Sequence, residues 1–148
     1  MKAITICQPY AWLITLPETD PRHKRVENRT WPTRYRGPLL IHAGKSRDWL
    51  DTWEDITPQE VAALQYGVIV AKANLTACLP LAEIRHGRYP DRLCWLSGHQ
   101  HAEGPFCWVL EDVMPLEPMP CTGARGLWDY WPPAPALEAA GPLFGETQ

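Results

Sequence analysis

Residues 23–43, HKRVENRTWPTRYRGPLLIHA, decide the fold that we expect for this chain. Val26 to Trp31 (VENRTW) has the character of a β-strand that leads into a turn at Pro32-Thr33. Gly37 then opens the apolar run Pro38 to Ala43 (PLLIHA), which is typical of a buried strand. The stretch therefore predicts two strands joined by a polar loop.

Positive charge gathers in the same part of the chain. The 148-residue sequence has a formal net charge of −3, yet eight of its 14 lysines and arginines lie between Arg22 and Arg47, where Glu27 is the one acid. Asp48 to Glu60 carries five acids and no base. A basic patch with interleaved aromatic residues is the footprint of nucleic-acid binding, whereas a pI near 5.9 argues against coating duplex by charge alone. A solvated basic face, compensated by the acidic stretch, is the alternative interpretation.

Outward from this stretch, the sequence predicts a mixed order of strands and helices. Further strands are expected at Lys2–Cys7, Val68–Leu79 and Phe106–Val113, and short helices at Pro9–Leu16, at Arg47–Trp53 with Ser46 as the cap, and after the Thr57-Pro58-Gln59-Glu60 capping box. Residues 81–104 contain few periodic apolar residues and are expected to be mostly loop. The expected core includes Ile4, Ile6, Leu39, Ile41, Val68, Val70 and Val109. Without a regular strand–helix alternation, the pattern favours an α+β fold, a small mixed β-barrel with flanking helices, over a doubly wound sheet.

Length and composition favour one domain. At 148 residues and 45% hydrophobic, the chain is expected to form a single domain over residues 1–131, and a loosely packed or disordered Pro/Ala/Gly-rich tail over residues 132–148. No apolar run reaches the roughly 18 residues of a spanning helix, and the first 16 residues lack signal-peptide features. We therefore expect a soluble cytoplasmic protein without membrane partners, with a monomer as the default.

Metal and cofactor sites are not expected from the sequence. The five cysteines are scattered without a C-x-x-C pair. His86, Cys94, His99 and His101 lie close in sequence, but they lack the paired ligands of a structural zinc site. A loop that contains histidines is the simpler interpretation.

Four segments together resemble an ASCH domain, a branch of the PUA-like superfamily. They are CQPYAWLI (7–14), HKRVENRTWPTRYRGPLLIHA (23–43), GVIVAKANLTAC (67–78) and GPFCWVLEDVMPLEPMPCTGARGLW (104–128). Lys24, Glu27 and Arg29 match the K-x-x-E-x-R part of the family signature. The resemblance implies a small β-barrel with helices beside it, and a cleft between barrel and helix that receives RNA or a single base.

Glu27 is the expected polar anchor of that cleft. A carboxylate among cations keeps its charge, and can accept hydrogen bonds from a base edge or orient a lysine. Arg29 and its basic neighbours are expected to hold Glu27 or to contact phosphate. The full set expected to bind RNA or a modified nucleoside is Gln8, Pro9, Tyr10, Lys24, Glu27, Arg29, Trp31, Arg34, Tyr35, Arg36, His42, Lys45 and Trp128.

Within this set, Trp31 is the preferred stacking residue, and the strand–helix junction at Gln8-Pro9-Tyr10 is expected to offer backbone N–H groups to an anion. The alternative for Glu27 and Arg29 is a purely structural ion pair that supports the barrel.

Enzymatic and adaptor functions stay open at this point. Some ASCH-like proteins are amidohydrolases on acetylated cytidine that use a lysine with a threonine three positions on, but here Glu27 follows Lys24 at that spacing. Others are described as ribonucleases that rely on lysine and tyrosine. If the chain is an enzyme, Lys24, Glu27 and Tyr35 are the catalytic candidates, with Tyr10 as the alternative tyrosine. A protein-interaction adaptor that uses the Pro-rich residues 115–135 is a third hypothesis.

Overall fold

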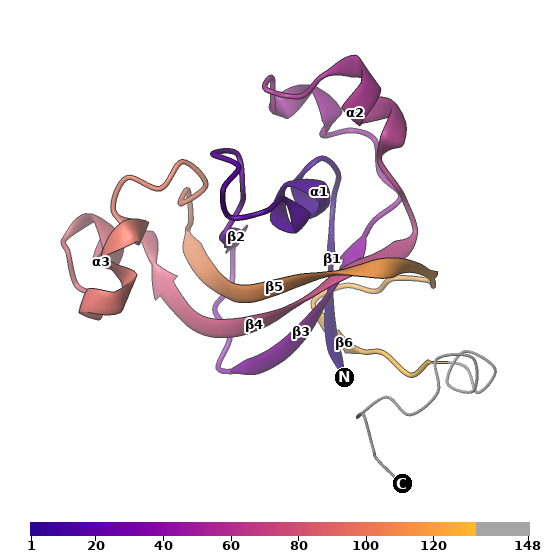
Figure 1. Ribbon diagram of the computed structural model, residues 1–148. Coiled ribbons are helices and arrows are strands. Elements are labelled where there is room, and N and C mark those ends of the chain that lie inside the picture. Colours follow the sequence, from indigo (N-terminus) through magenta and orange to yellow (C-terminus); the bar gives the residue numbers. More distant parts are fainter. Residues whose placement is uncertain (133–148) are drawn as a thin grey trace, which may run out of the picture.

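The computed structural model describes residues 1–132, so the tail predicted at 132–148 lies outside the described residues except for Pro132. The described elements are β1 (Lys2–Ile6), α1 (Tyr10–Thr15), β2 (Val26–Arg29), β3 (Gly37–Ala43), α2 (Pro58–Ala63), β4 (Val68–Pro80), α3 (Leu81–Arg85), β5 (Phe106–Pro120) and β6 (Leu127–Asp129), with 3₁₀ turns at Leu50–Thr52 and Asp91–Leu96. The strands form one sheet of order β2-β5-β4-β3-β1-β6. Long β4 and β5 curl this sheet into a half-open barrel, and the short helices lie beside it (Figure 1). The expected α+β barrel is confirmed.

Most of the predicted core lies inside the barrel. Ile4, Ile6, Leu39, Ile41 and Val109 are at most 2% exposed. Strand β1 pairs in parallel with β3, and β3 pairs in antiparallel with β4, so Ile4, Ile6, Leu39 and Ile41 pack against one another at the centre of the sheet.

The inward face of β4 differs from the prediction. Val68 and Val70 are only half-buried, whereas Ile69 and Ala71 are fully buried. The start of this strand is apolar at successive positions, so alternation could not choose the face. The register of its pairing with β3, which includes a bulge between Ile41 and His42, determines which face points inward.

Strand β5 is longer than predicted. The sequence predicted that it ends at Val113, because the residues that follow include several prolines. Proline lacks the N–H group that a central strand needs. Strand β2 pairs only with Phe106–Val109, so among residues 1–132 the later part of β5 has β4 as its one neighbouring strand. Prolines are tolerated along such an edge, and the strand continues to Pro120.

The helix predictions were partly right. The capping box is present, since Thr57 Oγ1 accepts from the Glu60 N–H at 3.1 Å and Glu60 Oε1 accepts from the Thr57 N–H at 2.9 Å. The helix predicted at Arg47–Trp53 is reduced to a 3₁₀ turn that buries none of its residues, so no apolar face stabilises a longer helix.

Residues 81–104 are more ordered than the loop that we expected. They form α3 and a 3₁₀ turn whose Ile84, Leu93 and Leu96 pack on Val26 and Val109 as a second apolar cluster. The segments are too short to show a helical period, which explains why the sequence pattern missed them.

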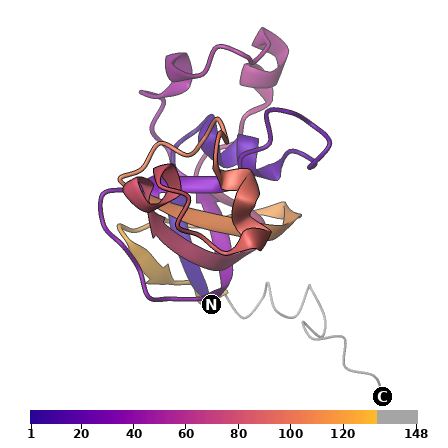
Figure 2. The same cartoon turned by 90° about the vertical axis from the view of Figure 1, so that its left-hand side faces the viewer.

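Residues 44–66 stand out from the barrel between β3 and β4, and we call this segment the arch (Figures 1 and 2). Its base is closed by the Gly67 N–H, which donates to the Ala43 carbonyl at 2.7 Å. Every residue from Lys45 to Ala63 is exposed or half-buried. The arch therefore lacks an apolar core of its own and depends on contacts with the domain below it. Within residues 1–132, no helix has the length and apolar character needed to cross a membrane.

Candidate functional site

A cavity of about 420 Å³ lies between the barrel, α1 and the arch. This volume falls within the roughly 300–1,000 Å³ of small-molecule sites. The lining residues are Thr5, Ile6, Cys7, Tyr10, Lys24, Glu27, Asn28, Arg29, Trp49, Thr52, Trp53, His101 and Glu103. They come from segments far apart in the sequence, so the cavity exists only in the folded domain.

An ion triad forms one wall. Glu27 accepts from Lys24 Nζ at 3.2 Å through Oε1 and from an Arg29 Nη at 3.0 Å through Oε2. Lys24 also donates to the Val26 carbonyl, and its ammonium lies 5.7 Å from the centre of the Tyr10 ring. The same Arg29 Nη donates to the Thr5 carbonyl at 2.8 Å. Both cations are thus fixed by neutral as well as charged acceptors.

A turn of the backbone before β2 brings Lys24 into this wall. The Lys24 N–H donates to the Leu13 carbonyl of α1 at 3.0 Å, while the Arg25 carbonyl accepts from the Leu110 N–H of β5 at 2.9 Å. The Arg25 guanidinium instead stacks on the Trp95 ring at 3.7 Å from its centre. Lys24 therefore joins Glu27 and Arg29, and Arg25 serves a different surface.

The opposite wall is aromatic and comes largely from the arch. The Trp53 ring lies on the His101 ring, with centres 4.7 Å apart and planes inclined by 32°. Trp49 lies at the rim and is 52% exposed. Tyr10 anchors this side, because its hydroxyl is 2.5 Å from Thr52 Oγ1. A flat group that enters the cavity would meet ring faces as well as charges.

His101 is a neutral member of the site. Burial, aided by the nearby Lys24 charge, lowers the pKa of its imidazole to about 4. Its Nε2 lies 3.1 Å from the Arg22 carbonyl, which can only accept, so Nε2 carries the proton and Nδ1 keeps its lone pair. Asn28 holds this loop, donating to the His101 carbonyl at 2.8 Å and accepting from the Gly104 N–H at 2.7 Å.

Arg22 ties the arch to the domain. Its guanidinium donates to both carboxylate oxygens of Glu60, at 3.0 and 3.1 Å, and to the Asp55 carbonyl at 3.1 Å. It also forms two bonds to the Asp20 carboxylate, at 3.1 and 2.9 Å. These hydrogen bonds hold the pKa values of Asp20 and Glu60 below their usual range. Arg22 thereby fixes the segment that carries Trp49 and Trp53.

Trp31 and Tyr35, expected beside Glu27, lie elsewhere. The Trp31 ring packs edge-on against Trp108, with centres 4.8 Å apart. The Tyr35 hydroxyl donates to the Pro38 carbonyl at 2.5 Å, and its ring lies against Gly37. Both side chains fold back onto the barrel core, because the loop after β2 turns away from the cavity. The expectation that one of them joins the cleft was wrong.

His42 and Trp128 form a separate network below the cavity. His42 Nδ1 lies 3.2 Å from Thr5 Oγ1, its Nε2 lies 2.8 Å from the Cys121 carbonyl, and Trp128 Nε1 donates to Thr5 Oγ1 at 3.2 Å. Gly123 fits against this network without a side chain, since a Cβ there would lie 2.7 Å from His42 Nδ1. The network supports β1, whose Thr5 carbonyl in turn positions Arg29.

The backbone N–H groups at the strand–helix junction are used in hydrogen bonds within the junction itself. The Tyr10 and Ala11 N–H groups donate to the Cys7 carbonyl, at 3.0 and 3.3 Å, and the Trp12 N–H donates to Gln8 Oε1 at 2.9 Å. These donors are not free for the anion that we expected. Pro9 is the residue that precedes α1.

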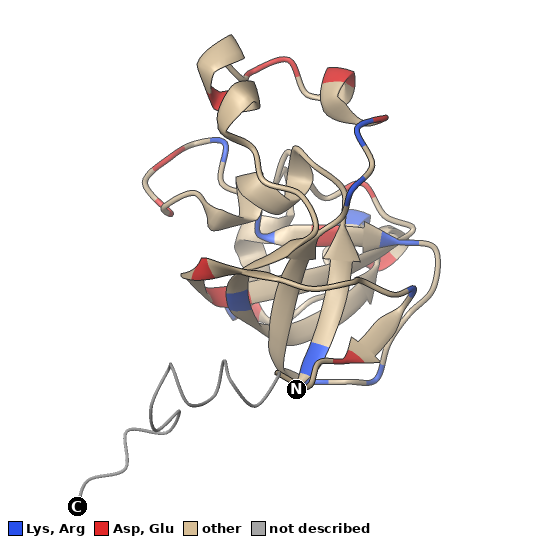
Figure 3. Cartoon of the chain, turned by 90° about the vertical axis from the view of Figure 1, so that its right-hand side faces the viewer, with Lys and Arg blue, Asp and Glu red and all other residues tan. Residues whose placement is uncertain are grey.

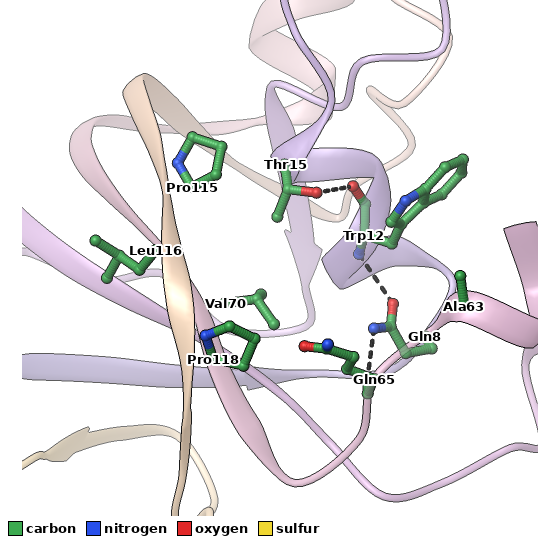
Figure 4. A pocket seen from close by; sticks show the side chains of 9 residues that line it. All are labelled: Gln8, Trp12, Thr15, Ala63, Gln65, Val70, Pro115, Leu116 and Pro118. Carbon is green, nitrogen blue, oxygen red and sulfur yellow. Dashed lines mark hydrogen bonds between the residues drawn. The ribbon is translucent and has the colours of Figure 1, made fainter.

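Gln8 faces a second, smaller cavity of about 190 Å³ between α1, the arch and β5 (Figure 4). Its Nε2 donates to the Gln65 carbonyl at 2.8 Å, so both ends of the amide are used within the protein. The rest of the lining is mostly apolar: Trp12, Ala63, Val70, Pro115, Leu116 and Pro118, with Thr15 and Gln65.

The remaining predicted cations are exposed. Arg34 and Arg36 lie on the loop between β2 and β3, where Arg36 donates to the Thr33 and Tyr35 carbonyls at 2.9 and 2.8 Å. Lys45 lies at the base of the arch, and its stem passes so close to Gly67 that a Cβ there would lie 2.9 Å from Cε. None of the three lines the main cavity.

Sequence reasoning missed Trp49, Trp53 and His101 as site residues. The two tryptophans lie within the acidic stretch Asp48–Glu60, and His101 had been considered only as part of a metal group. Within residues 1–132, no cluster of three or more histidine, cysteine or acidic side chains is arranged to hold a metal ion. Burial raises the pKa of the Cys7 thiol, which therefore stays protonated at neutral pH.

Comparison with known proteins gave one finding. The family model of the ASCH domain matches residues 4–119. That range contains every residue that lines the main cavity. A search of curated proteins gave no match to the chain.

Proposed function

The chain belongs to the ASCH domain family, PUA-like domains proposed to bind RNA, and from that premise we propose that its main cavity binds an unpaired nucleobase, in single-stranded RNA or in a modified nucleoside. The base enters between the aromatic wall and the ion triad. Only unstacked bases can reach such a pocket, so duplex is a poor ligand.

The observation that carries this proposal is the pairing of a fixed ion triad with exposed indole surface in one cavity. Lys24, Glu27 and Arg29 provide donors and acceptors for the edge of a base, and Trp49 and Trp53 provide faces for its ring. Stacking on an aromatic side chain contributes about 1–3 kcal/mol per base. An ion triad with a purely structural role would not need aromatic side chains held over a cavity.

Hydrolysis in the same cavity is the second candidate. The neutral His101 beside Lys24 and Glu27 favours it, because a neutral imidazole can accept a proton. Against it, Lys24 already donates to Glu27 and to the Val26 carbonyl, so fewer of its donors are left for a substrate. Tyr35 lies outside the cavity lining, whereas the alternative Tyr10 lines the cavity with its hydroxyl held against Thr52 Oγ1. A binder is therefore our first choice.

The adaptor hypothesis has less support. Pro115, Pro118 and Pro120 belong to β5, where Pro115 and Pro120 pair with residues of β4, so they are part of the sheet rather than an extended ligand for a partner.

Binding of a labelled single-stranded RNA and of its duplex form tests the proposal. We expect the single strand to bind and the duplex to bind weakly. Trp53→Ala should weaken the single-strand complex by about 1–3 kcal/mol, or roughly 5- to 150-fold. Trp131→Ala is the matched control, because Trp131 is 79% exposed and lies outside the cavity lining. Equal affinity of both variants and the parent would contradict the proposed pocket.

Lys24→Ala separates the two candidates. In a binder the change should cost about 1.5–3 kcal/mol of affinity, the worth of one hydrogen bond to a charged group. In a hydrolase it should leave binding nearly intact and abolish turnover. Acetylated cytidine and a mixed RNA pool, each with and without divalent metal, are the substrates to incubate. Turnover by the parent and not by the variant would establish the hydrolase.

A further inference from the structure

The arch side of the main cavity is acidic, whereas the loop that leads away from the opposite side is basic. The arch rim contains Trp49 and Trp53 together with Asp48, Asp51 and Glu54. Among residues 1–132 these three acids have no cationic partner within ion-pair distance. The arch thus combines aromatic faces with uncompensated negative charge.

The rim at the end of β2 carries Arg29 and one acid, Glu103, and the loop that leads away from it is basic. Arg29 lines the cavity, and the loop that follows it carries Arg34 and Arg36, with no acid anywhere between residues 28 and 47. Figure 3 shows this side of the molecule, with basic segments on the loop after β2 and on the loop after β5.

Arg125 extends this basic surface from a distant part of the sequence. It is exposed on the loop between β5 and β6, which has no acid from residue 121 to 128. That loop lies against the loop after β2, since a Cβ on Gly126 would be 3.9 Å from the Trp31 ring. We call Arg34, Arg36 and Arg125 the basic strip. In the part of the chain that the structure describes, none of the three has a carboxylate partner.

We propose that the ligand is a single-stranded RNA whose backbone leaves the cavity along the basic strip, while the acidic arch keeps phosphate away and admits only the base. This inference rests on the proposed function, and it adds the partner and the path of its backbone. It assigns a role to the acidic stretch, which the pocket alone does not explain.

Electrostatics favours this path over one across the arch. Charges act over about 8–10 Å at ordinary ionic strength, so a phosphate beside the arch would be repelled by its acids. The two cations at the base of the arch, Lys45 and Arg47, are outnumbered by the five acids of residues 44–66, so the arch keeps a net negative charge. Arginines on the strip have exposed guanidinium groups, which suit phosphate oxygens.

The test compares a strip variant with a control of equal charge change. Arg34→Gln/Arg36→Gln/Arg125→Gln removes the strip, and Arg85→Gln/Arg88→Gln/Arg92→Gln removes three cations from the exposed region around α3. The probes are a single-stranded RNA of about ten nucleotides, in line with known site sizes, and a free nucleoside. Both are titrated at two salt concentrations.

The strip variant should lose RNA affinity and much of its salt dependence. Each phosphate contact on a single strand contributes about 0.7 to the slope of log K against log salt, so three contacts contribute about 2. The ratio of parent to strip-variant affinity should then shrink about 20-fold between about 50 and 200 mM salt. Nucleoside affinity should stay unchanged in this variant, and the control should behave as the parent does.

A second variant tests the acidic arch. Asp48→Asn/Asp51→Asn/Glu54→Gln should raise the affinity for RNA and leave that for the nucleoside unchanged, because only RNA brings phosphate to the rim.

The outcomes separate the two proposals. If nucleoside and RNA bind but the strip variant matches the control, the path is wrong and the pocket stands. If the parent binds neither probe, the proposed function fails and the path with it. Tighter binding of duplex than of single strand, or binding of anionic lipid vesicles through the strip without RNA binding, would overturn the inference in favour of that partner.

Discussion

Replacing Glu27 by glutamine would remove a negative charge from between two cations and leave the shape of the side chain almost unchanged. Glu27 is 8% exposed, and the side chain of its partner Lys24 is 3% exposed. Removing one partner of a buried ion pair costs about 3–5 kcal/mol, because the other charge stays buried without compensation. The Arg29 side chain is 23% exposed, so water offsets part of its loss. We therefore expect Glu27→Gln to lower the free energy of unfolding by about 3 kcal/mol.

The partner variant should behave differently. Lys24→Met removes the most buried cation of the triad and leaves Glu27 paired with Arg29. We expect it to cost less than Glu27→Gln, and the double variant Lys24→Met/Glu27→Gln to cost less than the sum of the two. The coupling arises because the second change removes a charge that the first left unpaired.

Urea denaturation of the parent and the three variants measures these differences. At this chain length, a loss of about 3 kcal/mol corresponds to a fall in melting temperature of roughly 6–12 °C. A loss below about 1 kcal/mol for Glu27→Gln, the range of exposed ion pairs, would show that water already solvates the triad. If the losses of unfolding free energy in the two single variants add up to the loss in the double variant, water also solvates the triad. In either case the assignment of the triad as a buried, coupled unit would be wrong.

Three further predictions concern the cavity and its cover. Arg22→Gln should increase hydrogen exchange in the arch at Trp53 and Glu60 while exchange in β4 stays as in the parent, because the bonds from Arg22 hold the arch. Burial lowers the pKa values of His99 and His101 to about 4, below the ordinary 6.5, so between these values the unfolded chain holds more protons than the folded one. The urea midpoint should therefore fall as the pH drops from about 6.5 to about 4, and His101→Gln should flatten this dependence; an unchanged slope would contradict the assignment of buried neutral rings. Trp53→Ala should also reduce the quenching of indole fluorescence by an added nucleoside, with the remainder due to Trp49, whereas persistence of the full signal would place the base elsewhere.

The sequence predicted a strand correctly where its local residue pattern agrees with its place in the sheet, and less well where the two differ. Strand β3 was expected from PLLIHA and observed as Gly37–Ala43, since apolar residues on both faces fit a strand at the centre of a sheet. The same continuous apolar character made the inward face of β4 undecidable from Val68 and Val70 alone. The length of β5 depends on which of its edges is paired. The positions of β2 and β4 determine this, so it could not be predicted from the residues of β5 alone.

The site was predictable where a signature places its residues. Lys24, Glu27 and Arg29 lie within six residues of one another, and the structure brings them together. The error over Trp31 came from treating closeness in sequence as closeness in space. Trp53 reaches the cavity through the arch, which is fixed by Arg22, a long-range contact that periodicity cannot reveal.

The prolines of β5 also bear on how the protein behaves at high concentration. A strand with one unpaired side presents N–H and C=O groups that can recruit a strand from another molecule. Pro115, Pro118 and Pro120 lack N–H groups over the part of β5 whose outer side, among residues 1–132, pairs with no other strand. Two copies therefore cannot form a continuous ladder along this edge. This edge of β5 is in this way protected against recruiting a strand from another copy.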